Sequence, residues 1–152
     1  MQIRNLLPED YPAADALMQQ LHQIHLQNRP DLFRPFLHPY TRGKFVEMTA
    51  DSGHICLAAV EDAQIVGICL VSIRTRSNMV DMLSAYVDDL VVNPAYQRRG
   101  IAAALLEEVQ TRAKAKGAQR LDLMVWSFNK SALRFYQALG MTPQRYILEK
   151  EL

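Results

Sequence analysis

The apolar residues of the first third of the chain predict a short strand followed by two helices. Residues 3–7 form a β-prone run closed by a proline, and a helix is expected to begin at Glu9 or Asp10. The residues that recur at helical spacing after this point are Ala14, Leu17, Met18, Leu21, Ile24 and His25. An irregular connection that contains three prolines, residues 28–40, separates this helix from a second one expected at residues 41–49.

The middle of the chain changes to a β-type pattern. Residues 54–60 and 64–74 are two β-prone runs joined by a three-residue connection, which is typical of an antiparallel hairpin. Residues 82–92 form a third long run, rich in β-branched side chains and ended by Asn93-Pro94. These three runs are expected to form the centre of a sheet.

The last third of the chain predicts two helices that alternate with two strands. Residues 100–116 carry apolar side chains on one helical face, and Gly117 stands just past the expected end. Residues 121–126 alternate as a strand, residues 130–139 predict a short helix, and residues 145–149 predict a last strand. This order of elements predicts an α+β fold in which helices pack on a mixed sheet.

Size, composition and charge narrow the class of protein. The chain has 152 residues, of which 49% are hydrophobic and 22% charged, so we expect one globular domain over residues 1–152. The formal net charge is only +1, and neither nucleic acid nor a membrane surface is therefore expected as a partner. Cys56 and Cys69 lie in strand-like runs outside any Cys/His cluster, which predicts reduced core residues and no metal site. Without a leader-like N-terminus or an apolar run of about 18 residues, the expected location is cytoplasmic.

The junction between the third β-prone run and the next helix is a candidate anion site. Backbone amides in the first turn of a helix lack internal partners and carry a partial positive charge. Gly100 allows an anion to come close, while Ala102 and Ala103 keep the first turn free of bulk. Arg98 and Arg99 add two cations, although alone these residues also fit a surface turn with solvated arginines. The spacing matches neither a Gly-Lys-Ser/Thr phosphate loop nor a dinucleotide fingerprint.

Two blocks of residues resemble the GNAT N-acetyltransferase superfamily. The sequence QRRGIA at residues 97–102, preceded by YVDDLVVNP at residues 86–94, resembles the acetyl-CoA-binding signature of that family. The sequence NKSALRFYQALGM at residues 129–141 resembles a later block, although Met141 replaces the usual aromatic residue. The blocks have the order and separation found in the family, and their joint occurrence is far more specific than either alone. The resemblance covers residues 82–141 and implies a GNAT-like α+β fold, with a mostly antiparallel mixed sheet of about six to seven strands and about four helices.

The resemblance implies that acetyl-CoA binds as a co-substrate. Its pyrophosphate is expected on the amides that begin the helix, and its pantetheine arm is expected to pair like an extra strand with the end of the preceding run. In the family that run splays from the strand at residues 121–126, which leaves a cleft where thioester and amine meet. Asn129 is expected to cap the next helix, to hydrogen-bond the coenzyme A arm, or to do both. The expected acetyl-CoA-binding residues are Leu90, Val91, Val92, Gln97, Arg98, Arg99, Gly100, Ile101, Ala102, Ala103, Asn129 and Tyr136.

Asp88 and Asp89 are the candidates for the group that accepts the proton of the amine. A lysine-like amine has a pKa near 10.4, so its deprotonation at pH 7 costs about 4.6 kcal/mol. Because side chains alternate along a strand, only one carboxylate is expected to face the cleft. A similarity to polyamine-type family members favours Asp88, while pairing of either carboxylate with an arginine is the structural alternative. Met124 stands where some members carry a catalytic Glu, which puts more weight on the Asp pair or on ordered water.

Tyr136 is the candidate proton donor. The resemblance places here a tyrosine whose hydroxyl protonates the departing coenzyme A thiolate. A phenol with a pKa of about 10 is matched to a thiol with a pKa of about 8.5. The alternative is a core tyrosine on an apolar helix face. The expected reaction is direct acetyl transfer without a covalent enzyme intermediate, and a backbone amide near Val91 would hold the oxyanion.

The identity of the amine acceptor is left open between a small molecule and a protein or peptide. His22, His25 and His38 flank the proline-containing loop, where the family tends to form its acceptor pocket, and residues 31–34 could line that pocket. One rival function is a non-catalytic acyl-CoA-binding sensor, against which the retained tyrosine argues. A second rival is a module whose two-arginine turn binds phosphorylated protein or nucleic acid, against which the near-zero net charge argues. A homodimer is one option for the assembly.

Overall fold

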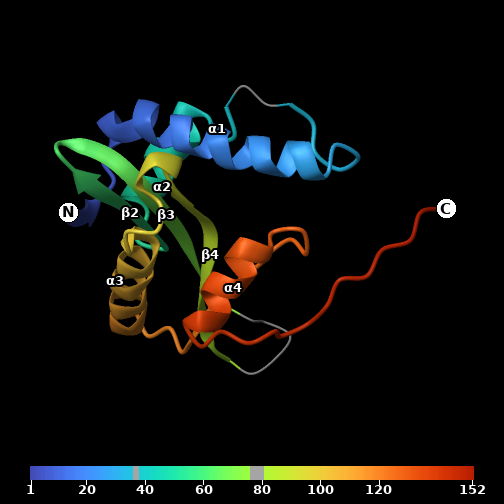
Figure 1. The fold of residues 1–152 in the computed structure, drawn as a ribbon. Coiled ribbons are helices and arrows are strands. Elements are labelled where there is room, and N and C mark those ends of the chain that lie inside the picture. Colours follow the sequence, from blue (N-terminus) through green and yellow to red (C-terminus); the bar gives the residue numbers. More distant parts are fainter. Residues whose placement is uncertain (36–37, 76–80) are drawn as a thin grey trace.

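A five-stranded sheet between two layers of helices makes up the computed structural model, which describes residues 1–35, 38–75 and 81–152 (Figure 1). The strands are β1 (Gln2–Asn5), β2 (His54–Glu61), β3 (Gln64–Thr75), β4 (Leu83–Val92) and β5 (Arg120–Leu123). The helices are α1 (Tyr11–Asn28), α2 (Arg42–Ala50), α3 (Ile101–Ala115) and α4 (Lys130–Ala138), with short 3-10 turns at Pro8–Asp10 and Pro94–Tyr96. The predicted α+β class and four helices are confirmed.

The strands lie in the order β1-β2-β3-β4-β5. Neighbours from β1 to β4 are antiparallel, whereas β4 and β5 are parallel because α3 connects them. The β4–β5 ladder runs only from the pair Ser84–Arg120 to the pair Val87–Leu123. The last four residues of β4, 89–92, therefore have a strand partner on the β3 side alone.

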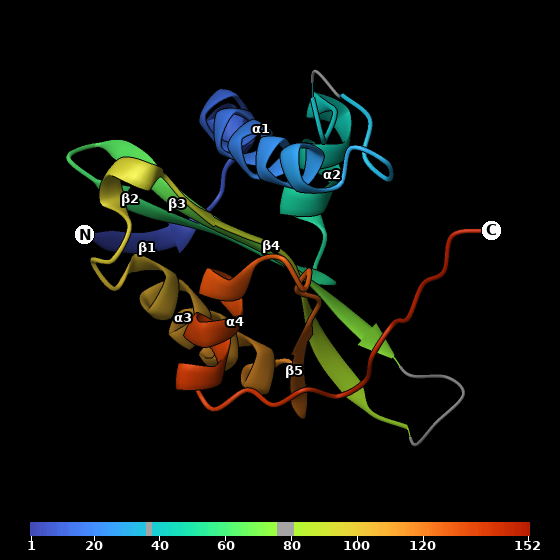
Figure 2. The ribbon, with the colours of Figure 1, turned by 45° about the vertical axis from the view of Figure 1, so that its right-hand side comes forward.

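Each face of the sheet carries its own core (Figure 2). Leu105, Leu106 and Val109 of α3 are buried against one face, with side chains of α4 packed at the margin. Leu17 and Met18 of α1 are buried against the other face, together with side chains of α2. Because α3 and α4 cover one face and α1 and α2 the other, a ligand reaches β4 only where its edge is open.

A β-bulge in β4 changes which way its side chains point. Leu70 of β3 pairs with Asp89 whereas Val71 pairs with Val87, so Asp88 is one residue too many for the ladder. The side chain of Val87 contributes to the α3 core before the bulge, and that of Leu90 packs on this core after it. The strict alternation, from which only one of the two aspartates was expected to face the cleft, is interrupted by this extra residue, so both aspartates leave the sheet on the α1 side.

The last strand expected at residues 145–149 is absent from the described structure. Residues 141–152 follow α4 as an extended segment without helix or strand, and residues 142–152 are exposed. The sheet among the described residues therefore has five strands, not six to seven. The strand expected at 121–126 is also shorter, because β5 ends where its ladder with β4 ends.

Three further observations concern the cysteines, membrane-spanning helices and metal sites. Cys56 and Cys69 are free and buried, as expected of core residues, and burial raises the pKa of both thiols. No described helix is both long and apolar enough to cross a membrane. Over residues 1–35, 38–75 and 81–152, no group of three His, Cys, Asp or Glu side chains could hold a metal ion.

Candidate active site

The turn between β4 and α3 reverses the chain and aims backbone amides away from the protein. The side chain of Asn93 accepts a hydrogen bond from the amide of Ala95 at 3.0 Å, and Nε2 of Gln97 donates to the carbonyl of Val92 at 3.2 Å. Arg98 and Gly100 both have positive φ angles, of 60° and 80°. These two left-handed residues turn the chain directly into the first turn of the helix.

The first amides of α3 form an unsatisfied group of donors. The first helical hydrogen bond runs from the amide of Ala104 to the carbonyl of Gly100 at 3.0 Å. The amides of Ile101, Ala102 and Ala103 have no acceptor within the part of the chain that the structure describes. Such a helix N-terminus favours a phosphate or pyrophosphate.

The two arginines of the turn differ in their contacts. Arg99 lies 3.6 Å from a carboxylate oxygen of Glu61, and its guanidinium stands 5.0 Å from the ring centroid of Tyr96. Arg98 is exposed, and no ion pair joins it to another described residue. We infer that Arg99 holds the turn against β2 while Arg98 is available to a ligand.

The open edge of β4 leads from this turn toward the middle of the sheet. Leu90 and Val92 pack their side chains on the α3 core, and Val91 is buried on the α1 side. Their ladder with β3 leaves the backbone groups on the β5 side without a strand partner. This edge can accept an extended chain of amide groups such as the pantetheine arm.

Asp88 is held by β3 beside the bulge. It accepts hydrogen bonds from the hydroxyl of Ser72 and, at 2.8 Å, from the guanidinium of Arg74. The same guanidinium lies 3.7 Å from the ring centroid of Tyr86. Asp88 is thus paired with an arginine, which is the structural alternative considered above for either carboxylate.

Asp89 has different surroundings from its neighbour. It accepts a hydrogen bond from the hydroxyl of Tyr40 at 2.8 Å. Burial raises the pKa of Asp89 to about 6, a hydrogen bond from Tyr40 opposes that rise, and the charge of Asp88 adds to it. Tyr40 is itself fixed, because its carbonyl accepts a hydrogen bond from Tyr11 at 2.7 Å. At neutral pH a carboxylate with this pKa is ionised and still basic enough to take a proton.

Tyr136 and Asn129 lie on α4 and at its start, on the other face of the sheet. Oδ1 of Asn129 accepts the amide of Ala132 at 3.1 Å, so the expected helix cap is confirmed. The ring of Tyr136 packs on the α3 core beside Phe135, and burial followed by the nearby Cys69 raises its pKa to about 12. Its hydroxyl has no partner among the described residues and stays protonated at neutral pH.

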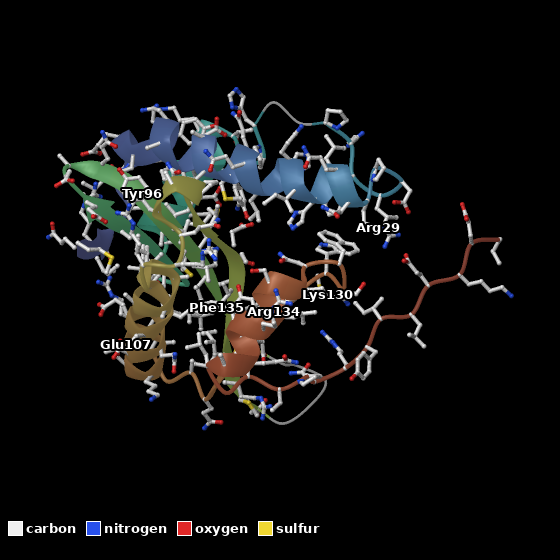
Figure 3. All side chains as sticks on the ribbon, in the orientation of Figure 1. Arg29, Tyr96, Glu107, Lys130, Arg134 and Phe135 are labelled. Atoms are coloured by element: carbon white, nitrogen blue, oxygen red, sulfur yellow. The ribbon has the colours of Figure 1, made fainter. Side chains whose placement is uncertain are left out.

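Aromatic side chains from two distant segments meet on the α1 side. The ring centroids of His25 and Phe33 are 5.1 Å apart, those of Phe33 and Trp126 are 5.4 Å apart, and Trp126 stacks on Phe128 at 6.1 Å. Arg29 lies 5.6 Å from the centroid of Trp126, at the end of α1 that faces the start of α4 (Figure 3). Burial lowers the pKa of His25, and the nearby His22 lowers it further. We call His25, Phe33, Trp126 and Phe128 the aromatic wall.

A protein family matches most of the chain. The family model "Acetyltransferase (GNAT) family" matches residues 7–141. The chain belongs to the GNAT acetyltransferase family. A stretch of 55 residues is 38% identical to the thialysine N-epsilon-acetyltransferase of Bos taurus, over 36% of this chain and 32% of that protein. The match thus spans about a third of the length of that curated relative.

Solved GNAT structures agree with the fold from end to end. A point mutant of the BH1408 protein from Bacillus halodurans has a TM-score of 0.94 at 26% identity, over 100% of this chain and 99% of that one. An aminoglycoside N-acetyltransferase solved in complex with CoA has a TM-score of 0.76 at 19% identity, over 99% of both chains. The second likeness concerns the fold alone.

The residues of this chain fit the coenzyme A that the GNAT family implies. Three free amides at the start of α3 suit its pyrophosphate. The open edge of β4, which leads away from these amides, suits its pantetheine arm. The β4–β5 ladder ends where the family resemblance implies a splay.

Sequence reasoning missed Tyr40 and the contacts by which Trp126 and Phe128 join His25 and Phe33, which were candidates for the acceptor pocket, in the aromatic wall. Tyr40 and Asp89 are 49 residues apart, and Tyr40 follows the irregular proline-containing connection, so no periodic signal links them. His38 bonds to the buried Asp15 at 2.7 Å, and His22 to the carbonyl of Arg34 at 2.9 Å. Neither histidine contacts the Asp pair.

One cavity of the protein lies away from this site. Its volume is about 210 Å³, and it lies between the ends of β1 and α2, the start of β2 and the last turns of α3. Arg112 and Lys116 line it, but both already bond to protein oxygens. The opposite end of α3 carries the free amides, so this cavity has no part in the site.

Proposed function

We propose that this protein transfers the acetyl group of acetyl-CoA directly to the primary amine of a small cationic molecule. The observation that carries the proposal is the arrangement along β4, where an open edge links a free helix N-terminus to a bulge with two carboxylates. In this arrangement the pyrophosphate lies on α3, and the thioester lies beside the residues that follow the bulge. The amide of Val91 is the donor proposed for the oxyanion.

Asp89 is the proposed base, in place of the earlier preference for Asp88. The proton of the ammonium group moves to Asp89, and the neutral nitrogen then attacks the thioester carbonyl to form a tetrahedral intermediate. The carbon–sulfur bond breaks, the nitrogen loses its second proton to water, and Tyr136 gives its hydroxyl proton to the thiolate before it recovers one from solvent. The pKa of about 6 supports this choice, while Asp88 already serves Arg74.

The acceptor is proposed to be small and positively charged. Two carboxylates on the α1 side favour a cationic amine, and the aromatic wall offers π-faces to a second cation or an apolar stem. Thialysine and aminoglycosides, the compounds named for two similar proteins, are both polyfunctional amines. They define the first compounds to test.

Release of free thiol from acetyl-CoA tests the proposal with a panel of diamines, amino acids, aminoglycosides and peptide N-termini. Tyr136→Phe is expected to lower kcat on the order of tenfold to a hundredfold with little change in acetyl-CoA affinity. Acetyl-CoA binding without turnover on any amine would favour the non-catalytic sensor. Absence of acetyl-CoA binding would overturn both the acetyltransferase and the sensor. Preferred acetylation of peptide N-termini would contradict the small-molecule acceptor.

A further inference from the structure

Asp15 is a buried carboxylate on α1 that the proposed reaction does not use. Its side chain is 9% exposed, and its Oδ1 has no hydrogen-bond partner within the described part of the chain. Its Oδ2 accepts hydrogen bonds from Nε2 of Gln19 at 2.8 Å and from Nδ1 of His38 at 2.7 Å. A buried carboxylate costs folding free energy unless it is fully hydrogen-bonded, so packing alone does not favour this residue. What Asp15 adds to α1 is the contact with His38.

Residues 38–40 are held along α1 at two points. His38 bonds to Asp15, and the carbonyl of Tyr40 accepts a hydrogen bond from the hydroxyl of Tyr11 at 2.7 Å. Tyr11 and Asp15 are four residues apart, so they lie on one face of the helix, about 6 Å apart along its axis. Two residues of a non-helical chain span at most about 7 Å, so the two bonds match the separation of residues 38 and 40.

The segment held in this way carries the hydrogen-bond donor of the proposed base. The hydroxyl of Tyr40 donates to Asp89 at 2.8 Å, and this bond opposes the rise in the pKa of Asp89 that burial causes. Residues 38–40 lie outside helices and strands, and α2 begins only at Arg42. Because a side chain has few allowed rotamers, the backbone position of Tyr40 decides whether its hydroxyl reaches the carboxylate. The two contacts with α1 fix that position.

We propose that Asp15 and Tyr11 are positioning residues for Tyr40. Asp15 acts on Tyr40 through His38. Tyr11 acts on the carbonyl of Tyr40 directly, and both contacts hold its hydroxyl against Asp89. This inference rests on the proposed function, in which Asp89 accepts the proton of the amine. The hydrogen bond favours the ionised carboxylate, so the base is in its proton-accepting form down to a lower pH.

The other ionisable groups near the Tyr40–Asp89 bond lie on the sheet. Asp88 and Cys56 interact electrostatically with Tyr40. Cys69 interacts with Asp89, on which the charge of Asp88 also acts. Substitutions on α1 or at His38 leave all of these groups in place. A change in the pKa of Asp89 in such variants therefore reports the position of Tyr40.

Carbon NMR of side-chain carboxyl groups measures the pKa of Asp89 without substrate, and Asp89→Asn identifies its signal. His38→Ala removes a donor to Asp15 and should raise this pKa from about 6 by about 0.5–1 pH unit. His38→Asn places an amide N–H where Nδ1 stands and should restore the wild-type pKa. Because both variants lack the imidazole, the difference between them reports the hydrogen bond and not a charge on residue 38.

His54→Ala is the matched control. Nδ1 of His54 lies 2.6 Å from the carboxylate of Asp51 in an equivalent contact at the cavity away from the site, so this variant should leave the pKa of Asp89 unchanged. Tyr11→Phe keeps the ring that packs on Phe45 and should raise that pKa as His38→Ala does. Equal pKa values in wild type, His38→Ala and Tyr11→Phe would overturn the proposal.

A double variant separates positioning from a general loss of stability. In the Tyr40→Phe background the hydroxyl is already absent, so His38→Ala should cause no further rise in the pKa of Asp89. An equal rise in both backgrounds would show an effect that does not pass through Tyr40 and would overturn the positioning role. The pH–rate profile tests the proposed function separately. If the pKa in kcat/KM stays constant while the NMR value rises, Asp89 is not the base, although Tyr40 is positioned as proposed.

Discussion

Asp88 and Asp89 show how two adjacent carboxylates acquire different chemistry. Arg74 forms an ion pair with Asp88 at 2.8 Å, whereas Asp89 is buried and has a neutral phenol as its donor. Burial is the largest cause of the raised pKa of Asp89, and the adjacent charge adds to it. The bulge therefore presents one carboxylate that is paired with an arginine and one, Asp89, that we propose for proton transfer.

The acid limb of the pH–rate profile should move in opposite directions when the two neighbours of Asp89 are changed. Tyr40→Phe removes a hydrogen bond that favours the ionised carboxylate, so the apparent pKa in kcat/KM should rise from about 6. Asp88→Asn removes a like charge, so the same pKa should fall. The exposed Tyr146→Phe serves as the control and should move neither limb. Shifts of equal sign would remove Asp89 as the base.

Asp89→Asn should make the protein more stable while it removes activity. Folding raises the pKa of this carboxyl from 3.8 to about 6, so the folded state binds the proton more tightly than the unfolded state. Stability is then lost as the pH rises through this interval, by about 2–3 kcal/mol at neutral pH. The asparagine avoids this loss, and its oxygen can still accept Tyr40. Urea unfolding should show the gain near pH 7.5 and little difference below about pH 4.

At the scale of elements, local patterns predicted most of the fold. The helix expected from residue 100 begins at Ile101 with Gly100 as its cap, and the hairpin strands agree within one residue at each end. These elements have strong periodicity and glycine or proline at their boundaries. The bulge was missed because one additional residue is defined by the register with β3, which a single strand does not contain.

The prediction of a last strand at residues 145–149 was wrong for a related reason. The apolar run at residues 146–148 reports the local β preference of residues 145–149, whereas a strand also needs an edge to pair with. Local sequence patterns also do not predict contacts between distant segments, such as the Tyr40–Asp89 hydrogen bond and the Phe33–Trp126 ring contact. The turn that we propose for acetyl-CoA was predictable as a turn into a helix, because its main-chain geometry follows a contiguous motif. The acceptor side is assembled from separate loops.

Two glycine substitutions separate the role of the α3 turn from general effects on stability. Gly100 has a φ of 80° with open space around it, so Gly100→Ala should cost about 1 kcal/mol through backbone strain alone. The substitution should shift the free amides at the start of α3 and thereby also raise the KM for acetyl-CoA several-fold. Gly43→Ala in α2 likewise meets no atom within 4 Å but should stabilise the fold by about 0.5 kcal/mol, with KM unchanged. An unchanged KM for Gly100→Ala would argue against anion binding at this turn.

At the scale of the molecule, the sheet separates the two groups proposed for proton transfer. Asp89 leaves β4 on the α1 side, whereas Tyr136 packs on the α3 side. A reacting thioester can lie between them only beside the open edge of β4, because elsewhere the strands are paired. We therefore propose that the amine enters from the α1 face where the β4–β5 ladder has ended, while the proposed proton donor for the thiolate lies on the other face.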